Sequence, residues 1–325
     1  MKIFFLIFLG WSNCISALQN QEIEPDILRN GKRFSTWQGI EPDKWATLWM
    51  IKRYIAKDAY FFLVPPNSPL PENTIAFDVP NASIRRTNKQ AMFSQLKQTM
   101  ELNNNELEYL DKIIHDVEVN IWDKPKHPHS SWFETMYRNL QERYQRDQVP
   151  IDCYLIFFDK VAQLANQPNI SALDYENKLS LTDECPGIKK YTEQESVGRI
   201  GHMDILREIS LGKKIVFIDT REDQEYNEIH LPEAKILKLR DVNIETIKAY
   251  SHADLIVPYC VKDFRGFEVA KAMKQLGLKN VATLSPNGLK GWIDSGLPLV
   301  TTNGLTEKQA HEALVKCATE PQVCL

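Results

Sequence analysis

The segment 255–276 most constrains the fold of this chain of 325 residues. An apolar run, 255–259, ends at Cys260, and a short loop then leads to Arg265. Beyond the loop, apolar side chains recur at helical spacing, at Val269, Ala270, Met273 and Leu276. A short apolar run followed by an amphipathic helix is typical of a buried parallel strand and its crossover helix. The segment therefore predicts an α/β domain.

Cys260 stands between this strand and the start of the helix. The first N–H groups of a helix have no partner within the helix, and its dipole adds about half a positive charge there. Such a position binds anions, and Arg265 adds a permanent positive charge. We therefore expect the pKa of the Cys260 thiol to be lowered. The alternative is that Cys260 is a buried and inert cysteine.

Four motifs in the same half of the chain resemble the rhodanese family. They are residues 215–221 (IVFIDTR), residues 225–226 with 230–234 (EY and HLPEA), Tyr259-Cys260 with Arg265, and residues 280–281 with 288–292 (NV and GLKGW). The resemblance runs from about Val197 to Val300 and implies a central parallel sheet flanked by helices. Alternating strand and helix signals favour the same α/β fold independently.

The length of the loop points to one chemistry within this superfamily. Four residues separate Cys260 from Arg265, and the family's sulfurtransferases resemble this count, whereas its phosphatase and arsenate-reductase relatives carry one more residue. The resemblance therefore implies that Cys260 carries sulfur as a persulfide, with Arg265 as the second catalytic residue. The implied substrate-binding residues are those of the loop and helix start: Val261, Lys262, Asp263, Phe264 and Gly266.

Asp263 departs from the usual rhodanese pattern, in which many members have Gly at this position. A carboxylate there repels anionic donors such as thiosulfate and raises the pKa of a nearby thiol. Two interpretations follow: either the donor is not a small anion, or Asp263 points to solvent and pairs with Lys262. We expect structural roles for Asp219, Arg221 and His230, because buried ionisable groups are usually paired. We expect Trp292 to pack in the core.

The first half of the chain, 36–165, is predicted to be a mostly helical α+β domain. Asp43 is expected to cap a helix that runs through Tyr54, and 60–64 reads as a short strand. Further helices are predicted from apolar spacing at Met92, Phe93, Leu96 and Met100, at Leu107, Leu110, Ile113 and Ile114, and at Ile151, Leu155, Phe158 and Ala162.

This half resembles the chromate-resistance (ChrB-like) family. The matching residues are 43–46 (DKWA), 49–55 (WMIKRYI), 58–59 (DA), 77–80 (FDVP) and 114–116 (IHD). The chain departs from the family at 85–94, where the family usually shows a His and then Cys-[ST]-Phe-[DE]. Here the sequence has Arg85-Arg86 and Ala91-Met92-Phe93-Ser94, so any metal or oxyanion binding that depends on those family residues is in doubt.

Other polar residues of this half form a candidate binding site. A basic pair with a His suits an oxyanion such as chromate or sulfate, and the candidate residues are Lys52, Arg53, His115 and Asp116. The alternative is that Lys52 and Arg53 are solvated helix residues. His127 and His129 have no evident third ligand, so we interpret them as loop residues. No metal and no cofactor are expected.

The N-terminus predicts export. Met1-Lys2 precedes an apolar run, 3–11, and the small residues Ser16 and Ala17 follow, which is typical of a signal peptide at 1–17. The run is too short to span a bilayer, so we expect a periplasmic or secreted protein with no membrane contact after cleavage. An uncleaved membrane anchor is the alternative.

The cysteine count fits an oxidising compartment. Of the six cysteines, Cys14 leaves with the signal peptide, and an odd number remains, so at least one thiol stays free. If Cys260 is the free thiol, the pairs Cys153–Cys185 and Cys317–Cys324 can form. Because pairing cannot be deduced from sequence, this connectivity is a hypothesis.

The remaining organisation follows from length, polarity and charge. A chain of 325 residues exceeds what one core usually holds. A polar stretch at 166–196 is predicted to be a linker, and residues 197–303 are predicted to form the rhodanese-like domain. Residues 304–325 are predicted to form a C-terminal helix and tail, with a capping box of Thr306 and Gln309. The formal net charge is −4 with no long basic run, so nucleic acid is not an expected partner.

Three functions remain open at this point. The first is an exported sulfurtransferase that uses a small sulfur donor and a thiol or cyanide acceptor, with the N-terminal domain free to bind a protein partner. The second is a non-catalytic redox sensor or partner-binding protein in which Cys260 is only a redox-sensitive thiol. The third is a chromate or oxyanion stress protein.

Overall fold

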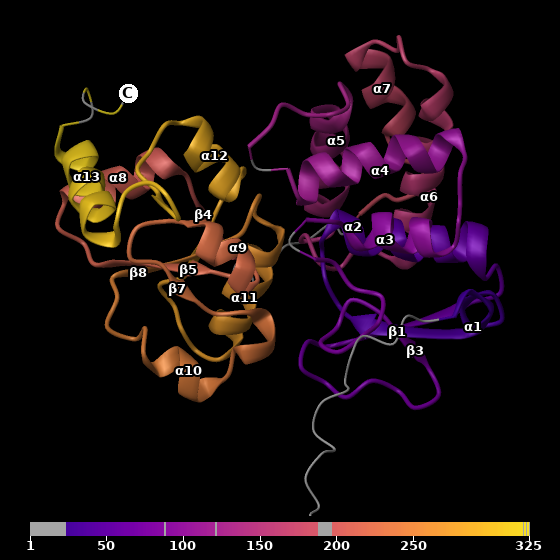
Figure 1. The fold of residues 1–325 in the computed structure, drawn as a ribbon, viewed down its shortest axis with the longest axis horizontal. Coiled ribbons are helices and arrows are strands. Elements are labelled where there is room, and N and C mark those ends of the chain that lie inside the picture. Colours follow the sequence, from indigo (N-terminus) through magenta and orange to yellow (C-terminus); the bar gives the residue numbers. More distant parts are fainter. Residues whose placement is uncertain are drawn as a thin grey trace, which may run out of the picture.

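A computed structural model describes residues 24–87, 89–120, 122–187 and 197–320, together with residues 322 and 324. The predicted signal peptide, Cys14 and the second part of the predicted linker lie outside these residues. The chain forms two lobes that lie side by side: an N-terminal lobe coloured indigo to magenta in Figure 1 and a C-terminal lobe coloured orange to yellow.

The N-terminal lobe contains a small parallel sheet. Its strand order is β2 (Tyr60–Val64), β1 (Arg33–Trp37) and β3 (Ile75–Ala76). The predicted strand at 60–64 is confirmed, whereas β1 lies largely before the predicted start of the domain. Phe34 of β1 is fully buried, so the sheet covers one end of the helical core.

Helices make up most of this lobe: α1 (Pro25–Arg29), α2 (Pro42–Met50) with the π-helix η1 (Ile51–Ile55), α3 (Met92–Thr99), α4 (Asn105–Glu118), α5 (Ser130–Glu142), α6 (Ile151–Gln163) with the 3₁₀ turn η2 (Leu164–Asn166), and α7 (Ala172–Leu179). The predicted helices correspond to α3, α4 and α6, whose apolar residues are buried. Sequence reasoning missed α5. It also missed α7, which lies inside the predicted linker and buries Tyr175 and Leu179.

The expected role of Asp43 was wrong. The helix α2 begins after Glu41 without a side-chain cap, and Asp43 lies in its first turn. The carboxylate of Asp43 instead accepts hydrogen bonds from the backbone N–H groups of Met92 (2.7 Å) and Phe93 (2.8 Å). Asp43 therefore caps α3, a helix far away in the sequence, because tertiary packing brings that helix start against α2.

The C-terminal lobe is the predicted α/β domain. A parallel sheet has the order β7 (Lys235–Ile236), β5 (Ile215–Asp219) and β8 (Leu255–Tyr259), and β4 (Gly198–Ile200) pairs with β9 (Ala282–Leu284). A parallel bridge between Ile256 and Val281 places β9 beside β8. Two short strands, β6 (Ile229–His230) and β10 (Val300–Thr301), form a separate antiparallel pair.

Helices flank this sheet, as the α/β expectation requires: α8 (His202–Ser210), α9 (Asp223–Glu228), α10 (Ile244–Lys248) with the 3₁₀ turn η4 (Leu239–Asp241), α11 (Phe264–Gln275), α12 (Gly288–Asp294) and α13 (Glu307–Thr319). The capping box of Thr306 and Gln309 opens α13 as predicted. This last helix packs against α8, on the side of the sheet away from the N-terminal lobe (Figure 1).

Both disulfides of the hypothesis are present. Cys153 pairs with Cys185, and Cys317 pairs with Cys324. Among the described residues, Cys260 is the free cysteine, and it is buried. The first disulfide ties the segment after α7 to α6, and the second ties the C-terminal tail to α13.

One apolar core runs through both lobes. It includes Phe133 and Tyr137 of α5 together with Phe264, Phe267 and Met273 of α11. The rings of Tyr137 and Phe264 meet edge to face, with centroids 5.9 Å apart. The N-terminal lobe therefore packs directly on the helix that follows Cys260.

Candidate functional site

Cys260 lies at the end of β8, immediately before the turn into α11, where the sequence placed it. A backbone hydrogen bond from Gly266 reaches its sulfur. The neighbouring turn is closed by Gly288, because a Cβ at this position would lie 1.5 Å from the carbonyl oxygen of Lys262. The loop around Cys260 is thus fixed by the start of α12 as well as by α11.

The expectation of a lowered thiol pKa was wrong. Burial raises the pKa of Cys260, and this effect outweighs the lowering by the charge of Arg265 and by the N–H of Gly266. Only 3% of Cys260 is exposed to solvent. The helix start and Arg265 are present as predicted, but the sequence could not show that the N-terminal lobe covers them.

Arg265 is held by Glu225. This residue lies on α9 and belongs to the motif of residues 225–226 and 230–234. The two Nη atoms of Arg265 each donate to a different carboxylate oxygen of Glu225, at 3.1 Å. Burial alone would raise the pKa of Glu225, but the charge and hydrogen bonds of Arg265 lower it to about 2. Arg265 Nε is buried and has no hydrogen-bond partner among the described residues.

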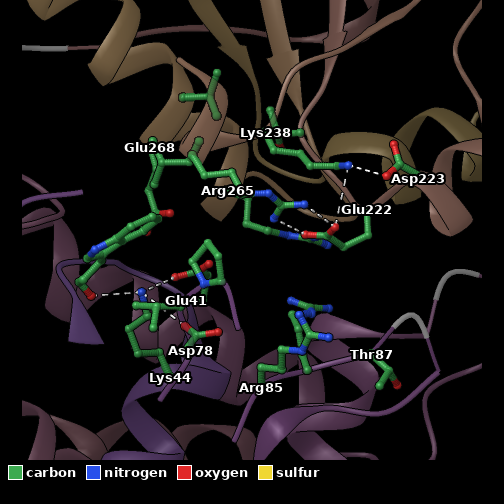
Figure 2. A pocket seen from close by; sticks show the side chains of 18 of the residues that line it. Glu41, Lys44, Asp78, Arg85, Thr87, Glu222, Asp223, Lys238, Arg265 and Glu268 are labelled. Carbon is green, nitrogen blue, oxygen red and sulfur yellow. Dashed lines mark hydrogen bonds and ion pairs between the residues drawn. The ribbon is translucent and has the colours of Figure 1, made fainter. Parts of the chain in front are cut away.

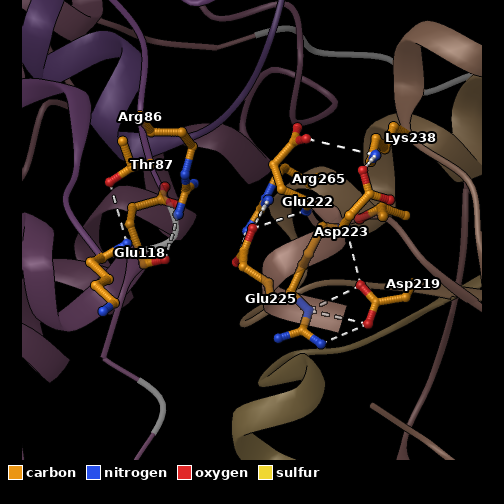
Figure 3. Close-up of polar contacts among 12 residues, drawn as sticks. Arg86, Thr87, Glu118, Asp219, Glu222, Asp223, Glu225, Lys238 and Arg265 are labelled. Atoms are coloured by element: carbon orange, nitrogen blue, oxygen red, sulfur yellow. Dashed lines mark hydrogen bonds and ion pairs between the residues drawn. The ribbon is translucent and has the colours of Figure 1, made fainter. Parts of the chain in front are cut away.

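A second buried ion pair faces this one from the N-terminal lobe. Arg86 donates to Oε2 of Glu118 at 2.9 Å and to its carbonyl oxygen at 2.7 Å. Figure 3 shows Arg86 and Glu118 opposite Glu225 and Arg265. The charge of Glu118 also raises the pKa of Cys260, so the N-terminal lobe acts on the cysteine electrostatically.

Asp263 does not point to solvent and does not pair with Lys262, which corrects that interpretation. It is fully buried and accepts hydrogen bonds from Arg138 Nη1 (2.6 Å), Arg146 Nη1 (3.0 Å) and Ser285 (2.9 Å). Burial would raise the pKa of Asp263, but the two guanidinium groups lower it. The charge of Asp263 still raises the pKa of Cys260, as expected from the sequence.

Lys262 takes part in the same contact between the lobes. Its ammonium lies 2.9 Å from Glu134 of α5, and Arg138 also donates to the carbonyl oxygen of Pro286 at 2.9 Å. The guanidinium of Arg138 stacks over the ring of Phe264. Sequence reasoning missed Glu134, Arg138 and Arg146 because no local motif marks them; only their position across the domain boundary gives them a role.

A cavity of about 580 Å³ opens between the two lobes. Of the predicted site residues, Arg265 lines it, whereas Cys260, Val261, Lys262, Asp263, Phe264 and Gly266 do not. Arg85 of the N-terminal lobe points into this cavity toward Arg265 and Glu222 (Figure 2). Arg265 is therefore the link between the cavity and the buried cysteine.

An acidic cluster occupies another part of the cavity wall (Figure 2). Lys44 lies 3.5 Å from Glu41 and 3.2 Å from Asp78. Glu268 of α11 accepts a hydrogen bond from the backbone N–H of Ile40 at 2.6 Å. Burial and the nearby charge of Glu41 raise the pKa of Glu268 well above its usual range.

The residues expected to have structural roles lie away from the cavity. Arg221 donates to Asp219 (2.7 Å) and to the carbonyl oxygen of Ile229 (2.5 Å), and this pair is inaccessible to solvent. His230 bonds to the carbonyl of Tyr226 and to Glu307. The indole N–H of Trp292 donates to the carbonyl oxygen of Pro298, and its ring packs edge to face on Phe217.

The four residues of the candidate oxyanion site have separate partners. Lys52 donates to the carbonyl oxygen of Ala59, and Arg53 forms a bidentate pair with Asp159. Lys126 lies 3.1 Å from His115. Asp116 accepts from the backbone N–H groups of 126 and 127 and from the hydroxyl of Ser130. Among the described residues, no hydrogen bond or ion pair joins Lys52 and Arg53 to His115 and Asp116.

His129 is more than a loop residue. It is 1% exposed and sits in an aromatic cluster with His127, Tyr109, Trp132 and Tyr175. Its Nδ1 lies 3.0 Å from the hydroxyl of Tyr109. Within the described part of the chain, no group of three or more His, Cys, Asp or Glu residues is arranged to hold a metal ion.

Comparison with known families agrees with the division into two lobes. Residues 203–295 match the family described as "Rhodanese-like domain", and residues 34–165 match "ChrB, C-terminal domain". The protein therefore combines a rhodanese-like domain with a ChrB C-terminal domain, and both resemblances predicted from the sequence are confirmed. No curated protein matches the chain.

Two solved structures are similar to part of the chain. The BH2092 protein from Bacillus halodurans is 26% identical, covering 32% of this chain and 77% of that one, with a TM-score of 0.30. Protein hp1203 from Helicobacter pylori 26695 is also 26% identical, covering 32% of this chain and 88% of that one, with a TM-score of 0.26. Within the described residues, no helix has the length and apolar character needed to cross a membrane.

Proposed function

We propose that this protein is an exported sulfurtransferase that carries sulfur as a persulfide on Cys260. The observation that carries the proposal is the position of Cys260: it ends a central strand of a rhodanese-like domain, receives the N–H of Gly266 and lies within the field of Arg265. Preorganised dipoles and charge of this kind stabilise a charged sulfur.

The reaction balances without an oxidant or a cofactor. The Cys260 thiolate attacks the outer sulfur of a donor of the type R–S–SH. A new S–S bond forms to Cys260 as the S–S bond of the donor breaks, and R–S⁻ leaves. A thiolate or cyanide then attacks the outer sulfur of the persulfide, takes it and releases the Cys260 thiolate. This is covalent catalysis in two displacements.

Export is proposed on two grounds. The first 17 residues read as a signal peptide, and two disulfides are typical of oxidising compartments. An expression experiment with a reporter fused after residue 30 tests this part. Recovery of the reporter in the periplasm or medium supports export, and retention in the cytoplasm contradicts it.

Intact-mass spectrometry tests sulfur transfer directly. The mature protein is incubated with thiosulfate and, separately, with a neutral organic persulfide, and Cys260→Ser is the control. We expect a gain of one sulfur atom that the variant lacks and that cyanide or a thiol removes. No gain from either donor, with the thiol still titratable in unfolded protein, would contradict the proposal.

The second candidate is a non-catalytic redox-sensing or partner-binding protein, and the burial of Cys260 favours it. A thiol that is 3% exposed and has a raised pKa is poorly placed for turnover in the resting chain. The third candidate, a chromate or oxyanion stress protein, is supported by the ChrB C-terminal domain. Equal growth on chromate with and without the protein would count against it.

A further inference from the structure

We propose that the cavity between the two lobes binds an amino-acid-like thiol or persulfide, a zwitterion that is held by its carboxylate and its ammonium group. This inference rests on the proposed sulfurtransferase function and names the substrate class. Its binding test is separate from the test of sulfur transfer, so the two can fail independently.

The size of the cavity argues for an organic ligand. Its volume of about 580 Å³ lies within the range of about 300 to 1,000 Å³ that is usual for sites of small organic molecules. An inorganic anion such as thiosulfate would fill only a small part of this space. The wall comes from both lobes, so the site exists only when the ChrB C-terminal domain is docked on the rhodanese-like domain.

One part of the wall offers unused capacity for an anion. Arg85 is exposed to the cavity and has no hydrogen-bond or ion-pair partner among the described residues. The Nε atoms of Arg86 and Arg265 are buried and also lack partners within the described chain. Guanidinium groups bind carboxylates in charge-assisted, bidentate geometry, so a ligand carboxylate fits between Arg85 and Arg265.

The opposite part of the wall suits a cation. Glu41, Asp78 and Glu268 surround a single ammonium, that of Lys44. This cluster therefore holds three carboxyl groups but one cation. Oxygen Oε2 of Glu41 is buried and forms an ion pair with the Lys44 ammonium at 3.5 Å, but this contact is not a hydrogen bond. A second ammonium, supplied by the ligand, would satisfy this acidic excess.

The remaining charges of the wall do not compete for the ligand. Arg240 forms a bidentate pair with Glu222, with both distances 2.8 Å. Lys238 pairs with Asp223 at 2.5 Å. Each of these pairs is neutral. Arg85 and the acidic cluster therefore remain as the two groups with unbalanced charge that can bind the ligand.

The arrangement also connects the bound ligand to the chemistry. Arg265 lines the cavity and is the residue whose charge lowers the pKa of Cys260. A carboxylate bound near Arg265 competes with Glu225 for its guanidinium. Ligand binding therefore loosens the ion pair of Arg265 with Glu225 and changes the field that Arg265 exerts on the buried thiol.

Isothermal titration calorimetry with S-methylglutathione tests the proposal, because this probe has two carboxylates and one ammonium but no reactive thiol. We expect saturable binding to the full chain and equal binding to Cys260→Ser. Arg85→Gln should weaken binding at least tenfold, since it removes the unpaired cation. Lys57→Gln, which changes an exposed cation of the same lobe outside the cavity, should leave binding within twofold.

Two modified probes test the zwitterion directly. The dimethyl ester removes the carboxylate charges, and the N-acetyl derivative removes the ammonium; each should bind at least tenfold more weakly than S-methylglutathione. No binding of the parent probe to folded protein would overturn the inference, as would equal binding by Arg85→Gln. If Cys260 gains sulfur but the probe does not bind, only this inference fails; if the probe binds but no sulfur is gained, only the proposed function fails.

Discussion

Asp263 accepts a hydrogen bond of 2.6 Å from Arg138, and this contact crosses the boundary between the two domains. Asp263 belongs to the loop that follows the cysteine, and Arg138 belongs to α5 of the N-terminal lobe. A carboxylate that looked unfavourable beside a sulfur-carrying cysteine is instead the anchor of the neighbouring domain. The loop and the domain interface are therefore one structural unit.

Replacing Asp263 should destabilise the docked state. In Asp263→Asn the carboxylate charge is lost. Arg146 then remains buried without this counter-ion, whereas Arg138 keeps its ion pair with Glu134. Removing one partner of a buried ion pair typically costs about 3 to 5 kcal/mol. We expect a loss of this size in the free energy of unfolding, measured by chemical denaturation.

The matched control for this variant is Asp58→Asn, an exposed aspartate of the N-terminal lobe. It should change stability by less than about 0.5 kcal/mol, as surface substitutions usually do. A similar small effect in Asp263→Asn would show that the interface does not depend on this contact.

The reactivity of Cys260 should report on the ion pairs around it. Because burial raises the pKa of Cys260 and the charge of Glu118 raises it further, the thiol should react slowly with iodoacetamide at neutral pH and faster as pH rises. Glu118→Gln removes that charge and should lower the thiol pKa, so its rate should exceed that of the parent protein at every pH below the plateau.

The rate is followed by intact mass over a pH series, and Arg265→Gln provides the opposite change. Loss of the Arg265 charge should raise the pKa of Cys260 and slow alkylation. If both variants shifted the profile in the same direction, local loosening of the structure rather than charge would control the thiol.

The Glu225–Arg265 pair should make stability depend on acid pH. Burial raises and Arg265 lowers the pKa of Glu225, from an ordinary 4.5 to about 2. A lowered carboxyl pKa stabilises the folded chain above the unfolded value, and this contribution is lost as pH falls from about 4.5 toward 2. A shift of this size corresponds to about 3 kcal/mol.

Glu225→Gln should therefore be less stable than the parent protein at pH 7, and the difference should shrink as pH falls through this window. Urea denaturation at a series of pH values measures it. A difference that stayed constant down to pH 2 would mean that Glu225 titrates no differently in the folded and unfolded chains.

The two disulfides should contribute unequally to stability. The sequence separation is 32 for Cys153–Cys185 and 7 for Cys317–Cys324. Chain-entropy arguments give about 4 kcal/mol for the longer loop and about 2 kcal/mol for the shorter one. Denaturation should show a larger loss of stability for Cys153→Ala with Cys185→Ala than for Cys317→Ala with Cys324→Ala. Non-reducing peptide mapping of the parent protein should find Cys260 unpaired.

Much of the C-terminal lobe was predictable because its signals are local. The strand that ends at Cys260, the helix that begins after the loop, and the capping box of Thr306 and Gln309 depend on residues that are close in sequence. The helices α3, α4 and α6 of the other lobe were predictable for the same reason, since apolar spacing alone indicates which face is buried.

The sequence by itself determined the two domain families, the parallel-sheet domain and the position of Cys260. Its odd number of cysteines after the signal peptide also predicted at least one free thiol beside two possible disulfides. Only the tertiary structure decided the environment of that cysteine. Arg138 and Arg146 reach Asp263 across more than 100 positions of sequence, and Arg85 meets Arg265 at a shared cavity. The physical reason is that burial and charge pairing depend on which surfaces pack together, so the lowered pKa expected from the helix start was reversed by the burial of the thiol.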